Sequence, residues 1–169
     1  MSEYTIRNAE IKDLPSITQI YNHYVEHTPI TFDLEPRSLD NRQKWFQQFA
    51  ETGRHRLLVV ESESTILGYA GTTQFRVKAA YDPSVETTIY LDQHHHRAGV
   101  GRQLYTALFT KIAEEDIHRI YAGITIPNDA SIQFHETFGF KHVGTFTEVG
   151  SKFGKYWDVS WHEKVIEAP

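Results

Sequence analysis

Residues 93–102 read Gln-His-His-His-Arg-Ala-Gly-Val-Gly-Arg and lie between an apolar, strand-like segment and an amphipathic, helix-like segment. Two glycines one residue apart, Gly99 and Gly101, favour a tight turn there. A helix that begins at such a turn presents backbone N–H groups without partners, and such groups bind anions. The stretch therefore predicts either a plain tight turn or a site for the phosphates of a cofactor.

Two common nucleotide-binding loops do not fit this stretch. A Walker A loop would need Lys followed by Ser or Thr after its second glycine, where this chain has Arg102 and Gln103. A dinucleotide fingerprint would need a third glycine, where this chain has Leu104. The residues alone thus exclude these two loops and leave the bound anion open.

Composition restricts the class of protein. The chain has 169 residues, a formal charge of −5 and no cysteine. The acidic balance disfavours nucleic acid and anionic membranes as partners, and the missing cysteines exclude disulfides and thiolate metal sites. Residues 1–13 lack the basic and apolar regions of a secretory signal, and no apolar run approaches the roughly 18 residues of a spanning helix. We expect one cytoplasmic domain over residues 1–169.

Hydrophobic periodicity predicts the element order β-α-α-β-β-β-α-β-α-β-β. Asp13 and Ser38 are the expected N-caps of the first two helices. The predicted helices cover about 13–26, 38–49, 99–114 and 128–137, and the predicted strands 4–7, 57–60, 66–73, 85–91, 119–124, 141–148 and 156–165. Residues 79–83 are expected to form a loop. Helices among antiparallel hairpins predict an α/β fold with a mixed sheet.

Residues 97–101, Arg-Ala-Gly-Val-Gly, resemble the acetyl-CoA pyrophosphate loop of the GNAT acetyltransferases. That pattern begins with Gln or Arg, where this chain has His96, whose imidazole can still donate a hydrogen bond. Asn-Asp-Ala-Ser at 128–131 and His-Glu-Thr-Phe-Gly-Phe at 135–140 resemble the second GNAT signature. The resemblance implies the GNAT fold, with a mostly antiparallel sheet of about seven strands and four flanking helices.

Further blocks resemble one subgroup, the phosphinothricin acetyltransferases and the related methionine sulfoximine and methionine sulfone acetyltransferases. These blocks are residues 22–24, 31–33, 80–82, 85–90, 127–129 and 152–158. The resemblance implies acetyl-CoA-dependent N-acetylation of such a small amino acid, without a metal, by an enzyme that is often a homodimer. Two alternatives stay open, namely acetylation of protein N-termini or another small amine, and a CoA-binding module without catalysis.

The resemblance places a general base at Glu86, in the strand predicted at 85–91. Partial burial would raise the pKa of this carboxyl group and let it accept a proton from the substrate. His135 stands where many GNAT enzymes have a tyrosine that protonates the leaving thiolate, so we expect it to be catalytic. The alternatives without a catalytic role are that Glu86 is a solvated residue at a strand edge and that His135 is a hydrogen-bonded structural residue.

The resemblance also implies that the strand ending at Leu91 diverges from its neighbour near that residue, and that the Leu91 N–H faces the thioester oxygen, where a donor stabilises an oxyanion. The expected cofactor-binding residues are Leu91, Asp92, Gln93, His96, Arg97, Ala98, Gly99, Val100, Gly101, Arg102, Asn128 and Ser131. The histidines at 94–96 are not expected to bind a metal, because adjacent side chains point apart.

An anionic amino acid needs cations in its binding site. Arg76 and Lys78 precede Glu86, and a guanidinium can bind a carboxylate through two hydrogen bonds. The expected substrate-binding residues are Phe32, Arg76, Lys78, Tyr81, Thr88 and Tyr90. Each cation could instead be a surface charge, and each aromatic residue a core residue.

Overall fold

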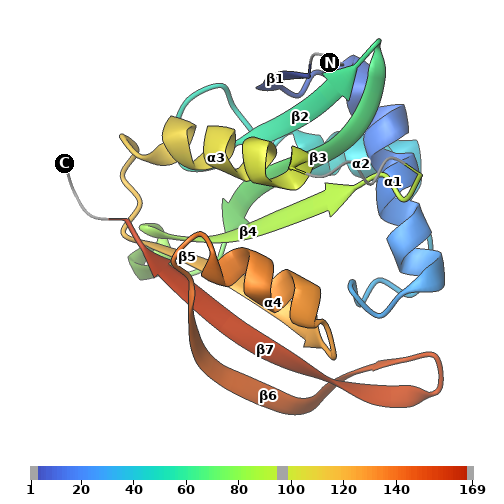
Figure 1. Ribbon diagram of the computed structural model, residues 1–169, viewed down its shortest axis with the longest axis vertical. Coiled ribbons are helices and arrows are strands. Elements are labelled where there is room, and N and C mark those ends of the chain that lie inside the picture. Colours follow the sequence, from blue (N-terminus) through green and yellow to red (C-terminus); the bar gives the residue numbers. More distant parts are fainter. Residues whose placement is uncertain (1–3, 95–98, 167–169) are drawn as a thin grey trace.

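The computed structural model describes residues 4–94 and 99–166. Within them, seven strands form one sheet in the order β1-β2-β3-β4-β5-β7-β6, flanked by four α-helices (Figure 1). The elements are β1 (Thr5–Asn8), α1 (Leu14–His27), α2 (Leu39–Phe46), β2 (Leu57–Ser62), β3 (Thr65–Gln74), β4 (Ser84–Leu91), α3 (Val100–Ile112), β5 (Arg119–Ile126), α4 (Asp129–Glu136), β6 (Lys141–Lys152) and β7 (Lys155–Val165). This confirms the predicted element order and the mixed, mostly antiparallel sheet.

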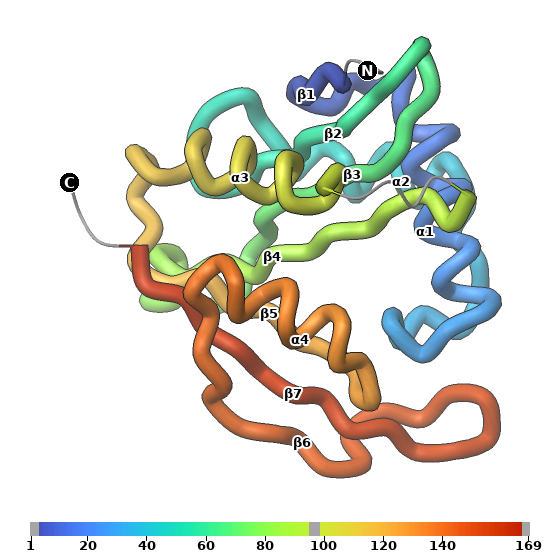
Figure 2. Tube along the Cα trace, viewed as in Figure 1, coloured from blue at the N-terminus to red at the C-terminus, as the bar shows by residue number. Residues whose placement is uncertain are grey.

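Helices cover both faces of the sheet, because side chains alternate between the faces along each strand. Leu58 and Val60 of β2 pack with α3 in one core cluster. Leu57 and Val59 of the same strand pack with α1 in the other cluster. Figure 2 shows the trace of α3 on the opposite side of β2 and β3 from α1 and α2. None of the helices in the described residues is long and apolar enough to cross a membrane.

Most predicted element ends lie within one to three residues of the observed ends, and α2 ends at Phe46 instead of residue 49. Three further local predictions differ from the structure. Residues 79–83 include a short 3-10 helix (Ala79–Tyr81) and are not wholly loop. Asp13 precedes α1 as predicted, but its carboxylate binds Arg7 at 2.7 Å and the Glu10 N–H at 2.7 Å instead of capping the helix. β6 extends to Lys152, beyond the predicted end near residue 148, because its irregular register keeps it paired with β7.

The sheet opens between its two parallel strands. β4 and β5 are in register only from Ser84↔Arg119 to Glu86↔Tyr121. Beyond that pair β4 continues along β3 to Leu91, whereas β5 continues along β7 to Ile126. The divergence therefore begins at Glu86, earlier than the predicted point near Leu91, and it places Glu86 at the base of the opening.

Candidate active site

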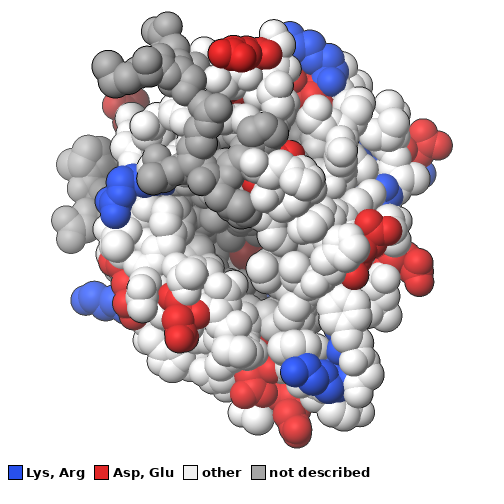
Figure 3. All heavy atoms as spheres, turned by 45° about the vertical axis from the view of Figure 1, so that its right-hand side comes forward, with Lys and Arg blue, Asp and Glu red and all other residues white. Residues whose placement is uncertain are grey.

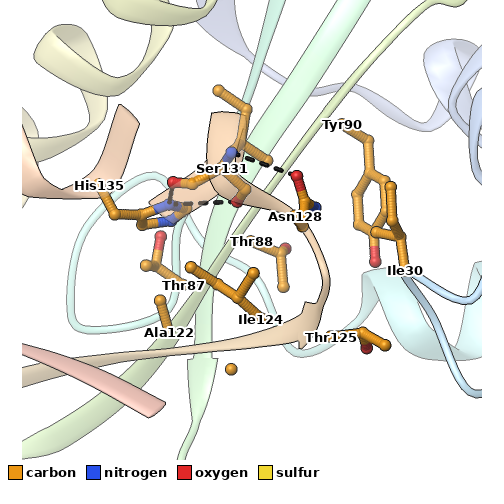
Figure 4. Close-up of a pocket in the computed structure, with 12 residues that line it drawn as sticks. Ile30, Thr87, Thr88, Tyr90, Ala122, Ile124, Thr125, Asn128, Ser131 and His135 are labelled. Carbon is orange, nitrogen blue, oxygen red and sulfur yellow. Dashed lines mark hydrogen bonds between the residues drawn. The ribbon is translucent and has the colours of Figure 1, made fainter. Parts of the chain in front are cut away.

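A cleft of about 70 Å³, the central cleft, lies where β4 and β5 diverge (Figure 4). β4 contributes one wall, β5 the other, and the start of α4 lies over them. Its described lining is Ile30, Thr87, Thr88, Ile89, Tyr90, Ala122, Gly123, Ile124, Thr125, Asn128, Ser131 and His135. The predicted residues Thr88, Tyr90, Asn128, Ser131 and His135 therefore meet at one place, although they come from different elements.

Two larger cavities adjoin the central cleft. The apolar cavity, of about 340 Å³, is lined by Ile30, Phe32, Glu86, Gly123, Thr125, Phe146, Val149, Val159 and Trp161. The basic cavity, of about 440 Å³, is lined by Tyr21, Asp33, Arg37, Asn41, Arg42, Lys44, Trp45, Tyr69, Thr73, Thr88 and Tyr90. Each shares lining residues with the central cleft, so the three spaces are neighbours around the diverging strands.

Glu86 is half-buried and lines the apolar cavity. Burial raises the pKa of its carboxyl group, and the positive charge of Arg76 partly opposes that rise. Its strand neighbours are Thr73 on β3 and Tyr121 on β5. A carboxylate with a raised pKa beside a cavity has the properties of a general base.

His135 is 4% exposed, and both of its ring nitrogens have protein partners. Nδ1 lies 2.8 Å from the Ser131 carbonyl oxygen, which can only accept, so Nδ1 carries the proton. Nε2 lies 3.0 Å from the Tyr105 hydroxyl oxygen and accepts from it in the neutral ring. Burial lowers the pKa of His135, which favours that neutral form. In this arrangement the ring holds no proton that is free for a leaving group.

The start of α4 is held by its own cap. The Asn128 side-chain oxygen accepts from the Ser131 N–H at 3.2 Å. His135 lies one turn later in the helix, and its Nδ1 is hydrogen-bonded to the Ser131 carbonyl oxygen, as Figure 4 shows. The helix therefore presents Asn128, Ser131 and His135 to the cleft as one connected group.

The N-cap residue of α3 is Gly99, which provides no side-chain cap, and such a helix start suits an anion site. Gly99 precedes the helix with φ +91°, a conformation that favours glycine. A Cβ at Gly101 would lie 3.3 Å from Cδ1 of Leu91, so the glycine lets the helix approach the end of β4. The N–H groups of Val100, Gly101 and Arg102 belong to the first turn, which has no intrahelical acceptors.

The turn between β4 and α3 contains several predicted cofactor residues. The Asp92 side chain accepts from the His94 N–H at 2.7 Å. Oε1 of Gln93 is buried and has no hydrogen-bond partner among residues 4–94 and 99–166. An orphaned amide next to an uncapped helix fits a ligand that carries both amide and phosphate groups, as CoA does. The predicted residues His96, Arg97 and Ala98 lie outside the described residues.

The predicted substrate residues divide into two groups. Phe32, Thr88 and Tyr90 line the cavities. Arg76, Lys78 and Tyr81 are exposed and line none of the three cavities. They lie in and before the 3-10 helix (Ala79–Tyr81), which carries their side chains to the surface. Arg76 still acts on Glu86 through its charge.

Sequence reasoning missed other lining residues. Arg37, Arg42 and Lys44 bring three cations to the basic cavity. Arg42 and Lys44 belong to the helix expected at 38–49, whereas Arg37 precedes it, and nothing in the sequence connects these residues to β4. Val159 and Trp161 line the apolar cavity from alternate positions of β7. That spacing shows that they share one face of the strand, but not which residues that face contacts.

On the face drawn in Figure 3, the charged side chains of the described residues form no continuous basic area. Asp and Glu side chains lie among the Lys and Arg side chains on this face. Within residues 4–94 and 99–166, no group of three or more His, Cys, Asp or Glu is arranged to hold a metal ion.

Comparisons with known proteins agree with this geometry. A model of the GNAT acetyltransferase domain matches residues 6–161. A phosphinothricin N-acetyltransferase of Streptomyces coelicolor is 49% identical over 167 residues, 98% of each chain. An L-methionine sulfoximine/L-methionine sulfone acetyltransferase of Pseudomonas aeruginosa is 34% identical over 157 residues, 93% of this chain and 91% of that protein.

A solved structure shows the same fold. The crystal structure of a phosphinothricin acetyltransferase from Sinorhizobium meliloti, in complex with acetyl-CoA, has a TM-score of 0.91 and 28% identity. The match covers 98% of this chain and 89% of that chain. The fold and the divergent parallel strands thus define an α/β acyltransferase. The chain belongs to the GNAT acetyltransferase family.

Proposed function

We propose that this protein transfers the acetyl group of acetyl-CoA to the amino group of a small amino acid, such as phosphinothricin, methionine sulfoximine or methionine sulfone. The observation that carries the proposal is Glu86, whose pKa is raised by burial, at the base of the divergent strands. The names of the relatives, similar over nearly the whole chain, supply the substrate class.

Acetyl-CoA supplies the acetyl thioester as a co-substrate. Its pyrophosphate binds at the start of α3, where residues 99–102 present N–H groups and the positive end of the helix dipole. Gln93, Asn128 and Ser131 bind the chain between the phosphates and the sulfur. The Leu91 N–H stabilises the oxyanion that forms at the thioester carbonyl.

Glu86 removes a proton from the substrate ammonium, directly or through a water, because only the free amine has a lone pair. The amine then forms the C–N bond, the C–S bond breaks as the thiolate leaves, and the second proton that the nitrogen loses passes through water to the thiolate. His135 positions Ser131 and Tyr105 around the cleft. It protonates the thiolate only if Nε2 first takes up a proton in place of the bond from Tyr105.

The amino end of the acceptor lies in the apolar cavity. Phe32 covers the carbon atoms of the acceptor, and the charge of Arg76 attracts its carboxylate toward the mouth of the cavity beside Glu86. Lys78 and Tyr81, which are exposed, contribute at the entrance. This orientation places the amine next to the base and the thioester.

A panel of acceptors tests the proposal. Release of free thiol from acetyl-CoA is measured with phosphinothricin, methionine sulfoximine, methionine sulfone and a short peptide with a free N-terminus. We expect turnover with at least one of the three amino acids and none with the peptide. Turnover with the peptide alone would favour an N-terminal acetyltransferase, and acetyl-CoA binding without any turnover would favour a binding module.

We propose that the enzyme works as a homodimer in the cytoplasm, as a single domain, without a metal, nucleic acid or membrane partner. Support for the dimer comes from β6, which is an edge strand of the sheet. Val143 of β6 is 56% exposed, and Phe153 and Tyr156 at the β6–β7 turn are also exposed. An exposed apolar sheet edge is a typical site for strand or side-chain contact with a second copy.

A further inference from the structure

The basic cavity lies directly beside the proposed base. The β3–β4 register pairs Thr73 with Glu86, and Thr73 lines the basic cavity. Thr88 and Tyr90, the next residues of β4 on the same face as Glu86, line both this cavity and the central cleft. A molecule whose amine lies at Glu86 can therefore extend across Thr88 into the basic cavity.

Arg42 is the unusual residue in this cavity. It is 5% exposed, and its guanidinium carbon lies 3.5 Å from the centre of the Trp45 ring and 4.7 Å from that of Tyr21. Nε and Nη2 have no hydrogen-bond partner in the described part of the chain. A buried charged donor without an acceptor costs free energy, so an anion that reaches this guanidinium would be bound strongly.

The charges that line the cavity leave it positive. Asp33 is the one acidic residue in its described lining, and it accepts hydrogen bonds from Arg37 and from the Tyr21 hydroxyl at 2.7 Å. The bonds from Arg37 hold the pKa of Asp33 below its ordinary value. Arg37 and Asp33 thus neutralise each other, and Arg42 and Lys44 carry the excess charge in a chain of net charge −5.

We propose that the basic cavity binds a second anionic group at the distal end of the acceptor, such as a phosphinate, with Arg42 and Lys44 as its ligands. The inference rests on the proposed function. Charge-assisted hydrogen bonds to a buried guanidinium are strong, and an acceptor with a neutral head cannot use them. The cavity therefore favours acceptors with two anionic groups over those with one.

Phosphinothricin and methionine sulfone form a matched pair for the test, since the first has an anionic phosphinate where the second has a neutral sulfone. We expect Lys44→Gln and Arg42→Met each to raise KM for phosphinothricin by about tenfold or more. KM for methionine sulfone and for acetyl-CoA stays within about twofold. Lys111→Gln, an exposed lysine on α3, is the matched control and leaves all three constants unchanged.

A second measurement does not depend on turnover. Trp45 contacts Arg42, so titration with methylphosphonate should produce a saturable change in tryptophan fluorescence that Trp45→Phe and Arg42→Met abolish. An equal rise of KM for both acceptors in Lys44→Gln, or no fluorescence change in the parent protein, would overturn the inference. If no amino acid is acetylated but the fluorescence change occurs, the proposed function fails while the anion site stands.

Discussion

Glu86 combines two opposite effects of burial at one residue. Its carboxyl group is half-buried where the strands diverge, and this raises its pKa. The raised pKa lets the carboxylate accept a proton at neutral pH, but ionisation of the buried group also costs folding free energy. Catalysis and stability therefore oppose each other at this position.

Glu86→Gln tests the catalytic side. The amide cannot accept the ammonium proton, so we expect kcat to fall by about 100-fold, with a smaller deficit at higher pH, where free amine is present in solution. The measurement is kcat against pH for both proteins with the best acceptor of the panel. Equal rates at neutral pH would remove Glu86 from the role of base.

The same variant tests the stability side. Because the pKa in the folded state is raised, the contribution of Glu86 to stability is complete below its ordinary pKa and is lost as pH rises through the raised value. Glu86→Gln removes that loss, so its Tm at pH 7 should exceed that of the parent by about 2 °C. The difference should disappear near pH 3.5 in calorimetry, and a gain of the same size at both pH values would contradict this reasoning.

A pair of variants at His135 and Tyr105 distinguishes a positioning role of His135 from the role of general acid. If His135 positions Ser131 through Nδ1 and Tyr105 through Nε2, His135→Gln and Tyr105→Phe should both raise KM for acetyl-CoA, by about tenfold or less. Both should keep the basic limb of the kcat–pH profile. Loss of that limb in His135→Gln alone would identify His135 as the acid.

At the scale of elements, the loop between α1 and α2 is fastened to the β6–β7 hairpin, and together they enclose the apolar cavity. The Lys152 ammonium group, buried in β6, donates to the Thr31 carbonyl oxygen at 2.8 Å. The Phe32 ring lies against Gly150 of the same strand. The acceptor site thus depends on contacts between segments that are more than 100 residues apart.

Gly150→Ala tests this contact. A Cβ at Gly150 would lie 2.1 Å from the Phe32 ring, so the ring must move out of its position on the cavity wall. We expect a rise of several-fold in KM for the amino acid and no change in KM for acetyl-CoA. Gly144→Ala is the control on the same strand, because a Cβ there meets nothing within 4 Å. Equal effects of the two substitutions would show that Phe32 does not shape the site.

At the scale of the whole molecule, the sheet ends in the long edge strand β6, with exposed apolar residues. If this edge joins two copies, Val143→Glu and Tyr156→Glu should convert a dimer to a monomer in sedimentation velocity, because a buried charge opposes association. Thr110→Glu, at an exposed position of α3, should leave the dimer intact. A monomeric parent protein would refute the proposed homodimer.

Local patterns predicted most of the fold. Apolar residues recur about every 3.6 residues in a helix and every 2 residues in a strand, and these patterns are visible within short windows of sequence. Ser38 caps α2 as predicted, since its oxygen accepts from the Asn41 N–H at 3.2 Å. Asp13 fails as a cap because a distant partner, Arg7 on β1, competes for its carboxylate. The site was predicted only in part, because nothing in the sequence near Arg42 or Val159 indicates that folding brings them close to Glu86.

The sequence alone determined the element order, the uncapped glycine turn before α3, and the placement of Glu86 on the strand before it. Only the tertiary structure decided where β4 and β5 diverge, that His135 is bonded through both nitrogens, and that Arg42 is buried beside the cleft. The reason is physical. Periodicity and capping depend on neighbours within a few residues, whereas burial, pKa and cavity shape depend on side chains that folding brings together from distant segments.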